Sequence, residues 1–158
     1  MGQPQSLAHK SYELITDAPS PATRSGFGAN PYRVLVAADD ARARSSLVSA
    51  LVPCGFDVLA FSEGRGVLEF LSMTMKRNVD VEPPDLIVAD LDLPGAGGLE
   101  VVAALRELDW STPVVLLTAF PDEALEEESA RMGVTAVFAK PVDLTELRSL
   151  ARELLPAA

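Results

Sequence analysis

The chain has 158 residues, a length typical of one domain, and 48% of them are apolar, which is sufficient for one buried core. With 13 Lys and Arg against 23 Asp and Glu, its net charge is -10, so its field repels nucleic acid and direct DNA binding is not expected. No run approaches the roughly 18 apolar residues of a membrane span. The single cysteine, Cys54, excludes an internal disulfide, and we expect a soluble protein of the reducing cytoplasm.

The first 31 residues are predicted to form a flexible N-terminal arm. They are rich in Ser, Pro, Thr, Gly and Ala and lack sustained periodicity, a composition typical of segments that cannot offset their own ordering entropy. Only "SLAHKSYELI" (residues 6–15) is compatible with a short helix. No basic segment precedes an apolar one, so a secretory signal is not indicated. The folded domain is expected over residues 32–158.

Short apolar runs alternate with amphipathic stretches from residue 32 onward. Within each run most apolar residues are consecutive and do not alternate with polar ones. This pattern is typical of parallel strands covered on both faces. Strict alternation predicts an α/β fold, a doubly wound five-stranded parallel sheet with helices on both faces. The predicted strands are residues 33–38, 56–61, 85–90, 113–118 and 135–140, and the predicted helices lie near 41–53, 64–77, 98–109, 122–132 and 143–155.

Polar residues follow or end four of the predicted strands. These are Asp39 and Asp40 after the first, Asp90 at the third, Thr118 at the fourth and Lys140 at the fifth. In doubly wound sheets ligands bind outside the carboxyl ends of the strands. Converging carboxylates repel one another, and a bound cation relieves the repulsion; an all-oxygen ligand set suits Mg²⁺. A hydroxyl and an ammonium beside them indicate a phosphoryl site, in which a carboxylate attacks phosphorus to give an acyl phosphate.

Each of these residues also has an ordinary structural interpretation. Asp39, Asp40 and Asp90 at strand ends are compatible with helix N-caps. Thr118 alone is typical of a turn, and Lys140 alone of a solvated charge. Only their combination at the correct strand ends favours a site.

Four segments resemble the receiver domain of two-component response regulators, across about residues 32–156. They are "VLVAADDA", "DLIVADLDLPGAGGLEV", "PVVLLTA" and "VFAKPV". The resemblance implies a flavodoxin-like sheet with strand order 2-1-3-4-5 and a cis Lys140-Pro141 bond. It also implies that Asp90 is phosphorylated and that Thr118 and Lys140 bind the phosphoryl oxygens. The implied Mg²⁺ ligands are Asp39, Asp40, Asp90 and the backbone carbonyl of Asp92.

The same resemblance implies a role in signalling. The phosphoryl donor would be a sensor histidine kinase or a histidine phosphotransferase, and the output would be relay of the group or binding of a downstream protein according to phosphorylation state. Catalysis would be limited to self-phosphorylation from a donor and self-dephosphorylation. Because the sequence ends at Ala158, just after the last predicted helix, we expect a stand-alone receiver similar to chemotaxis regulators.

The sequence departs from the family pattern at one consequential position. Val137, three residues before Lys140, stands where the family commonly has a Tyr or Phe that turns inward on phosphorylation. Phe138 is predicted to face the opposite side of the sheet and to pack in the core. Phe120, two residues after Thr118, either shields the site from water or packs on its own loop.

Two other functions are compatible with parts of the pattern. "DLDLP" resembles the Asp-x-Asp signature of haloacid-dehalogenase-type phosphatases, with Asp90 as nucleophile and Asp92 as acid. In that superfamily the acidic pair comes last, whereas here it precedes Asp90, and Pro94 replaces the usual Thr or Val. The second alternative is a receiver fold that binds proteins without being phosphorylated; the absence of an aromatic residue at Val137 is the one feature that favours it.

Overall fold

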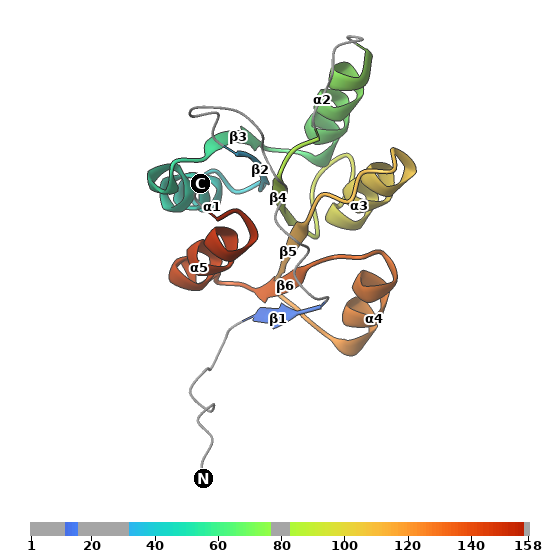
Figure 1. Ribbon diagram of the computed structural model, residues 1–158. Helices are drawn as coiled ribbons and strands as arrows, with labels where there is room; N and C mark the ends of the chain where they lie inside the picture. Colours follow the sequence, from blue (N-terminus) through green and yellow to red (C-terminus); the bar gives the residue numbers. More distant parts are fainter. Residues whose placement is uncertain (1–11, 16–31, 77–82, 157–158) are drawn as a thin grey trace.

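The computed structural model describes residues 12–15, 32–76 and 83–156. Its centre is a sheet of five parallel strands, each an apolar segment flanked by turns, in the order β3-β2-β4-β5-β6 (Figure 1). Counted along the folded domain this is the order 2-1-3-4-5, and the fold prediction is confirmed. The strands are β2 (Arg33–Ala37), β3 (Asp57–Phe61), β4 (Leu86–Asp90), β5 (Val114–Thr118) and β6 (Ala136–Ala139).

Five α-helices cover both faces of this sheet. Helices α1 and α5 lie on one face and α2, α3 and α4 on the other (Figure 1). Every residue of β4 and of β5 is buried, which explains why their apolar runs are continuous. The helices are α1 (Ala41–Leu51), α2 (Gly64–Lys76), α3 (Gly98–Glu107), α4 (Glu123–Arg131) and α5 (Leu144–Leu154), with a 3₁₀ turn η2 (Val52–Cys54) after α1.

A sixth strand, β1 (Tyr12–Leu14), was not predicted. It pairs antiparallel with β6, so these three residues form a strand and not the short helix with which residues 6–15 are compatible. The reason is a long-range contact: the Tyr12 ring stacks on Phe138, with centroids 4.2 Å apart and planes 5° from parallel. Apart from Ile15, the remainder of the predicted arm lies outside the described residues.

None of the helices in the described part of the chain is long and apolar enough to cross a membrane. The Lys140-Pro141 peptide bond is cis, as the family resemblance implies.

Candidate functional site

The predicted polar residues meet at one edge of the sheet because parallel strands place their carboxyl ends together. Asp90, the last residue of β4, lies opposite Leu117 of β5, and Thr118 of β5 lies opposite Ala139 of β6. The backbone N–H of Lys140 donates to the Thr118 carbonyl at 2.9 Å. This register brings a carboxylate, a hydroxyl and an ammonium to adjacent strand ends.

Asp90 is the buried centre of the site. Its side chain is only 2% exposed, and its Oδ1 lies 3.0 Å from the Nζ of Lys140, which is 39% exposed. Burial raises the pKa of the Asp90 carboxyl, against the opposing effects of the Lys140 ammonium and of a hydrogen bond from the Asp39 backbone N–H. The negative charge of Asp39 raises the Asp90 pKa further, and the hydrogen bond from its backbone N–H places Asp39 beside the Asp90 carboxyl.

The two residues of the acidic pair have different surroundings. Both side chains are exposed, but Asp40 is the N-cap of α1, and its Oδ2 accepts a hydrogen bond from the Ala43 backbone N–H at 2.8 Å. Arg44 holds the turn before the helix by donating to the Ala38 carbonyl at 2.8 Å. The structure therefore brings Asp39 to Asp90 and gives Asp40 a structural bond at the helix start.

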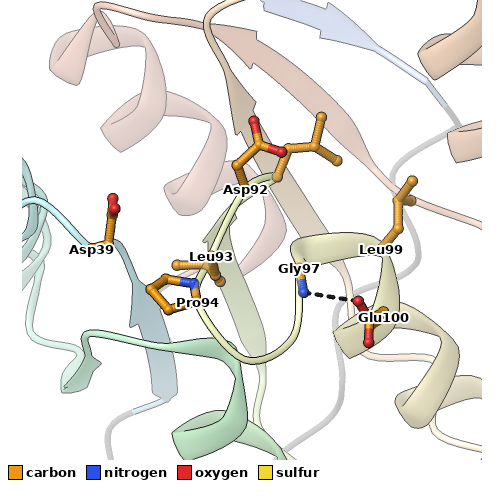
Figure 2. Close-up of a pocket in the computed structure, with 8 residues that line it drawn as sticks. Asp39, Asp92, Leu93, Pro94, Gly97, Leu99 and Glu100 are labelled. Atoms are coloured by element: carbon orange, nitrogen blue, oxygen red, sulfur yellow. Dashed lines mark hydrogen bonds between the residues drawn. The ribbon is translucent and has the colours of Figure 1, made fainter.

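Asp92 borders a shallow hollow beside Asp39, on the loop that leaves β4 (Figure 2). The glycines that close this loop have a steric role, since a Cβ on Gly98 would lie 2.7 Å from the Asp90 carbonyl oxygen. The first turn of α3 can thus lie directly against the strand end. The hollow is lined by Asp39, Leu91, Asp92, Leu93, Pro94, Gly97, Leu99 and Glu100.

Glu100 is one lining residue that was not predicted from the sequence. Its Oε1 accepts a hydrogen bond from the Gly97 backbone N–H at 3.3 Å, drawn as the dashed line in Figure 2. A capping residue followed three positions later by Glu is a recognisable helix-start pattern, so the signal was present in the sequence. Its role is to fix the start of α3.

The donor set fits a hard cation such as Mg²⁺. No set of three His, Cys, Asp or Glu side chains arranged to hold a metal ion occurs within the described ranges, so the expected convergence of three carboxylates is not seen. Asp39 and Asp90 nevertheless place two acidic groups near each other, and the nearby ligands are oxygens. Mg²⁺ typically uses one or two carboxylates and keeps several waters, so two suffice.

Thr118 is buried, and its Oγ1 accepts a hydrogen bond from the Phe120 backbone N–H at 3.1 Å. The hydroxyl proton remains available for an acceptor in the site. The Phe120 side chain is 82% exposed. A ring with that exposure packs against neither the site nor its own loop, so neither interpretation offered for Phe120 describes this conformation.

Val137 and Phe138 point to opposite faces of β6, as predicted from strand alternation. Val137 packs in the core beneath α2, α3 and α4, whereas Phe138 is fully buried in the core beneath α1 and α5. The side chain three residues before Lys140 is thus an ordinary aliphatic core residue.

Comparison with known proteins assigns the family. Residues 34–152 match the response regulator receiver domain, and the chain belongs to this family of two-component signalling proteins. The response regulator receiver protein CpdR of Brucella abortus is 30% identical, over 80% of this chain and 98% of its own length. Membership removes the haloacid-dehalogenase-type phosphatase alternative.

Other relatives match over only part of their length. Sporulation initiation phosphotransferase F of Bacillus subtilis is 33% identical over 49% of this chain and 63% of its own. The alkaline phosphatase synthesis regulatory protein SphR of Synechococcus elongatus is 31% identical over 92% of this chain and 54% of its own. The chain thus spans less than two thirds of these relatives.

Solved structures have the same fold. The receiver domain of the Francisella response regulator 1452 superposes with a TM-score of 0.68 at 26% identity, covering 79% of this chain and 96% of that one. The chemotaxis protein CheY4 of Vibrio cholerae gives 0.67 at 23% identity, over 80% and 100%, and at that identity it supports the fold alone.

Proposed function

We propose that this receiver domain accepts a phosphoryl group on Asp90 from the phosphohistidine of a sensor histidine kinase or a histidine phosphotransferase. The observation that carries the proposal is the buried Asp90 carboxylate held 3.0 Å from Lys140, with Thr118 at the next strand end. A buried carboxylate paired with an ammonium at the carboxyl edge of a doubly wound sheet is typical of a functional site, because ligands bind at that edge.

The transfer follows from these three side chains. One Asp90 carboxylate oxygen attacks phosphorus, a new phosphorus–oxygen bond forms, and the phosphorus–nitrogen bond breaks with its electron pair remaining on the imidazole. Lys140 then exchanges its contact with Asp90 for a contact with a phosphoryl oxygen, and the Thr118 hydroxyl donates to another. Attack of water on phosphorus later releases inorganic phosphate and restores the carboxylate.

Mg²⁺ would neutralise charge on the phosphoryl oxygens when bound. Asp39, Asp90 and the backbone carbonyl of Asp92 would hold it. Asp40 would contribute to the same charge cluster while it caps α1, because the cap bond uses one of its oxygens. Two acidic groups in this arrangement also repel each other less once a cation lies between them.

We further propose that the chain acts in the cytoplasm as a single-domain regulator. It would pass its phosphoryl group on or bind a downstream protein according to its phosphorylation state. Support comes from the CpdR relative, which is matched over 98% of its own length, and from the relative named as a phosphotransferase. Its net charge of -10 makes protein partners the expected targets, in preference to DNA.

The test is intact mass measurement after incubation with Mg²⁺ and phosphoramidate, a small phosphodonor. Wild type should gain one phosphoryl group, and Asp90→Asn or omission of Mg²⁺ should abolish the gain. Labelling of Asp90→Asn at another residue contradicts the assignment. A folded wild type that binds Mg²⁺ without gaining mass would favour the phosphorylation-independent binding module, the alternative consistent with the aliphatic Val137.

A further inference from the structure

The outer edge of β6 belongs to a strand that carries no charged residue. Its four residues read Ala-Val-Phe-Ala, and the first three are buried. Sheet edges offer unpaired backbone groups to other chains, and native proteins usually protect them with charges, prolines or short covering elements. In this chain the cover is β1.

The opposite edge of the sheet is protected differently. β3 begins with Asp57, whose carboxylate pairs with Arg33 of the neighbouring strand at 3.3 Å. No strand covers β3 in the described part of the chain, since the order ends there. β3 has one charged residue, at its start, whereas β6 has none and is covered by β1.

β1 pairs with β6 in the same way as an extended peptide that adds a strand to a sheet edge. Tyr12 lies opposite Phe138 and stacks on it, and Leu14 lies opposite Ala136 on the same face of the sheet. The Ile15 backbone N–H extends the pairing by donating to the Thr135 carbonyl at 2.8 Å. Main-chain bonds supply affinity in such sites, and alternate side chains supply specificity.

We propose that the β6 edge is a docking surface for an extended segment of a partner protein, and that residues 12–14 are an internal ligand occupying it. The chemistry of β1 defines the partner: an aromatic residue opposite Phe138 and an aliphatic residue two positions later opposite Ala136. The partner strand would add antiparallel to β6 after β1 leaves. This surface is separate from the Asp90 carboxylate, and the inference stands without phosphorylation.

Competition with β1 determines how tightly a partner binds. β1 is only three residues long and its Leu14 is 48% exposed, so few contacts hold it. Its attachment to the same chain gives it an effective concentration of roughly millimolar, which a free peptide must overcome. Apparent affinity falls in proportion to the fraction of molecules whose edge is free, so weakening β1 should strengthen peptide binding.

The experiment is an NMR titration of the full-length chain with the peptide KSYELITD, the chain's own residues 10–17, followed at the backbone amides of residues 135–139. Tyr12→Ser should bind the peptide at least tenfold more tightly than wild type. The peptide KSSELITD, without the ring, should bind at least tenfold more weakly to the same variant. Met73→Ser, which alters an exposed apolar residue on α2, is the matched control and should behave as wild type.

Equal binding of KSYELITD to wild type and Tyr12→Ser, or no saturable binding to either, would overturn the proposal. So would self-association of the variant, measured by sedimentation, without peptide binding, because the edge would then accept a second copy. If Tyr12→Ser loses its helical circular dichroism, Leu14→Ser replaces it, since half of that side chain already faces water.

Discussion

The two ends of the sheet each hold one charged side chain in a poorly hydrated position, and they satisfy it differently. At the carboxyl end, Asp90 has one ammonium partner, Lys140, which is itself partly exposed. At the amino end, Arg106 lies near the ends of α3 and α4 and bonds to fixed backbone carbonyls. Asp90 can therefore exchange its side-chain partner, whereas Arg106 cannot exchange its backbone acceptors.

Arg106 makes four hydrogen bonds to four different residues. Its Nε donates to the Met132 carbonyl at 3.0 Å, and its Nη2 to the Gly133 carbonyl at 3.0 Å. Its Nη1 donates to the carbonyls of Trp110 at 2.8 Å and Thr112 at 3.2 Å. Burial lowers the pKa of its guanidinium, and these carbonyls compensate the loss of water. Its planar fork ties the segments entering β5 and β6 together.

Replacing this arginine should destabilise the chain more than replacing Lys140 or Asp40. Arg106→Leu leaves four carbonyls without their donor and should lower the free energy of unfolding by about 2–3 kcal/mol in urea denaturation. Arg106→Lys keeps the charge but loses the fork, and its stability should fall between those of Arg106→Leu and wild type. Arg131→Leu is the matched control on α4: its guanidinium is exposed and pairs with Glu128, so stability should not change measurably. Equal losses for Arg106 and Arg131 would contradict the structural role.

Removing Lys140 should affect the other end of the sheet without unfolding the chain. Because the ammonium is partly exposed, Lys140→Ala should retain the native circular dichroism. It should reduce phosphorylation-dependent partner capture at least tenfold, because the contact between the Lys140 ammonium and a phosphoryl oxygen is lost. The measurement is a pull-down with phosphorylated and unphosphorylated chain. Lys140→Arg is the conservative control, and unchanged capture by Lys140→Ala would show that Lys140 does not report the phosphoryl group.

The ends of the sheet also differ in how far the sequence predicts them. Asp90, Thr118 and Lys140 could be found because strand ends are visible as the last polar residues of apolar runs, and parallel strands must end together. The Arg106 network could not, because carbonyls carry no side-chain signal and two of its acceptors, Met132 and Gly133, lie on another helix's end. A charged residue in a helix is expected to be solvated until the fold is known.

β1 was not predicted from the sequence for a similar reason. Three residues are too few for a periodic pattern, and "SLAHKSYELI" is equally compatible with a helix. What selects the strand is the Phe138 ring and the unpaired backbone of β6, both more than 120 residues away in sequence. Tertiary context decided this element, as it commonly does for short segments.

Asp40 combines features of both ends of the sheet, because it is an exposed carboxylate near the site and also makes a fixed structural bond. If its cap bond is its structural contribution, Asp40→Ala should cost about 1 kcal/mol of unfolding free energy, and Asp40→Asn clearly less, because an amide oxygen also caps. If the Asp40 carboxylate also helps to bind Mg²⁺, both variants should bind Mg²⁺ more weakly than wild type, measured by calorimetry. Equal Mg²⁺ affinity in wild type and Asp40→Asn would leave the residue with its cap alone.

The smallest expected effect is on the pH dependence of stability. It tests whether the ionised Asp90 carboxylate destabilises the folded chain. Burial raises its folded pKa above the ordinary value of 3.8, so the native chain holds this proton more tightly than the unfolded chain. Between those two pKa values the unfolded chain binds fewer protons, and the stability of wild type therefore falls as pH rises. Asp90→Asn has no such ionisation. Without added metal, its unfolding free energy should exceed that of wild type at neutral pH, and the difference should disappear below pH 3.8. A difference that is constant with pH, or that favours wild type at neutral pH, would mean that Lys140 and the Asp39 N–H outweigh burial, and that Asp90 is as well satisfied as Arg106.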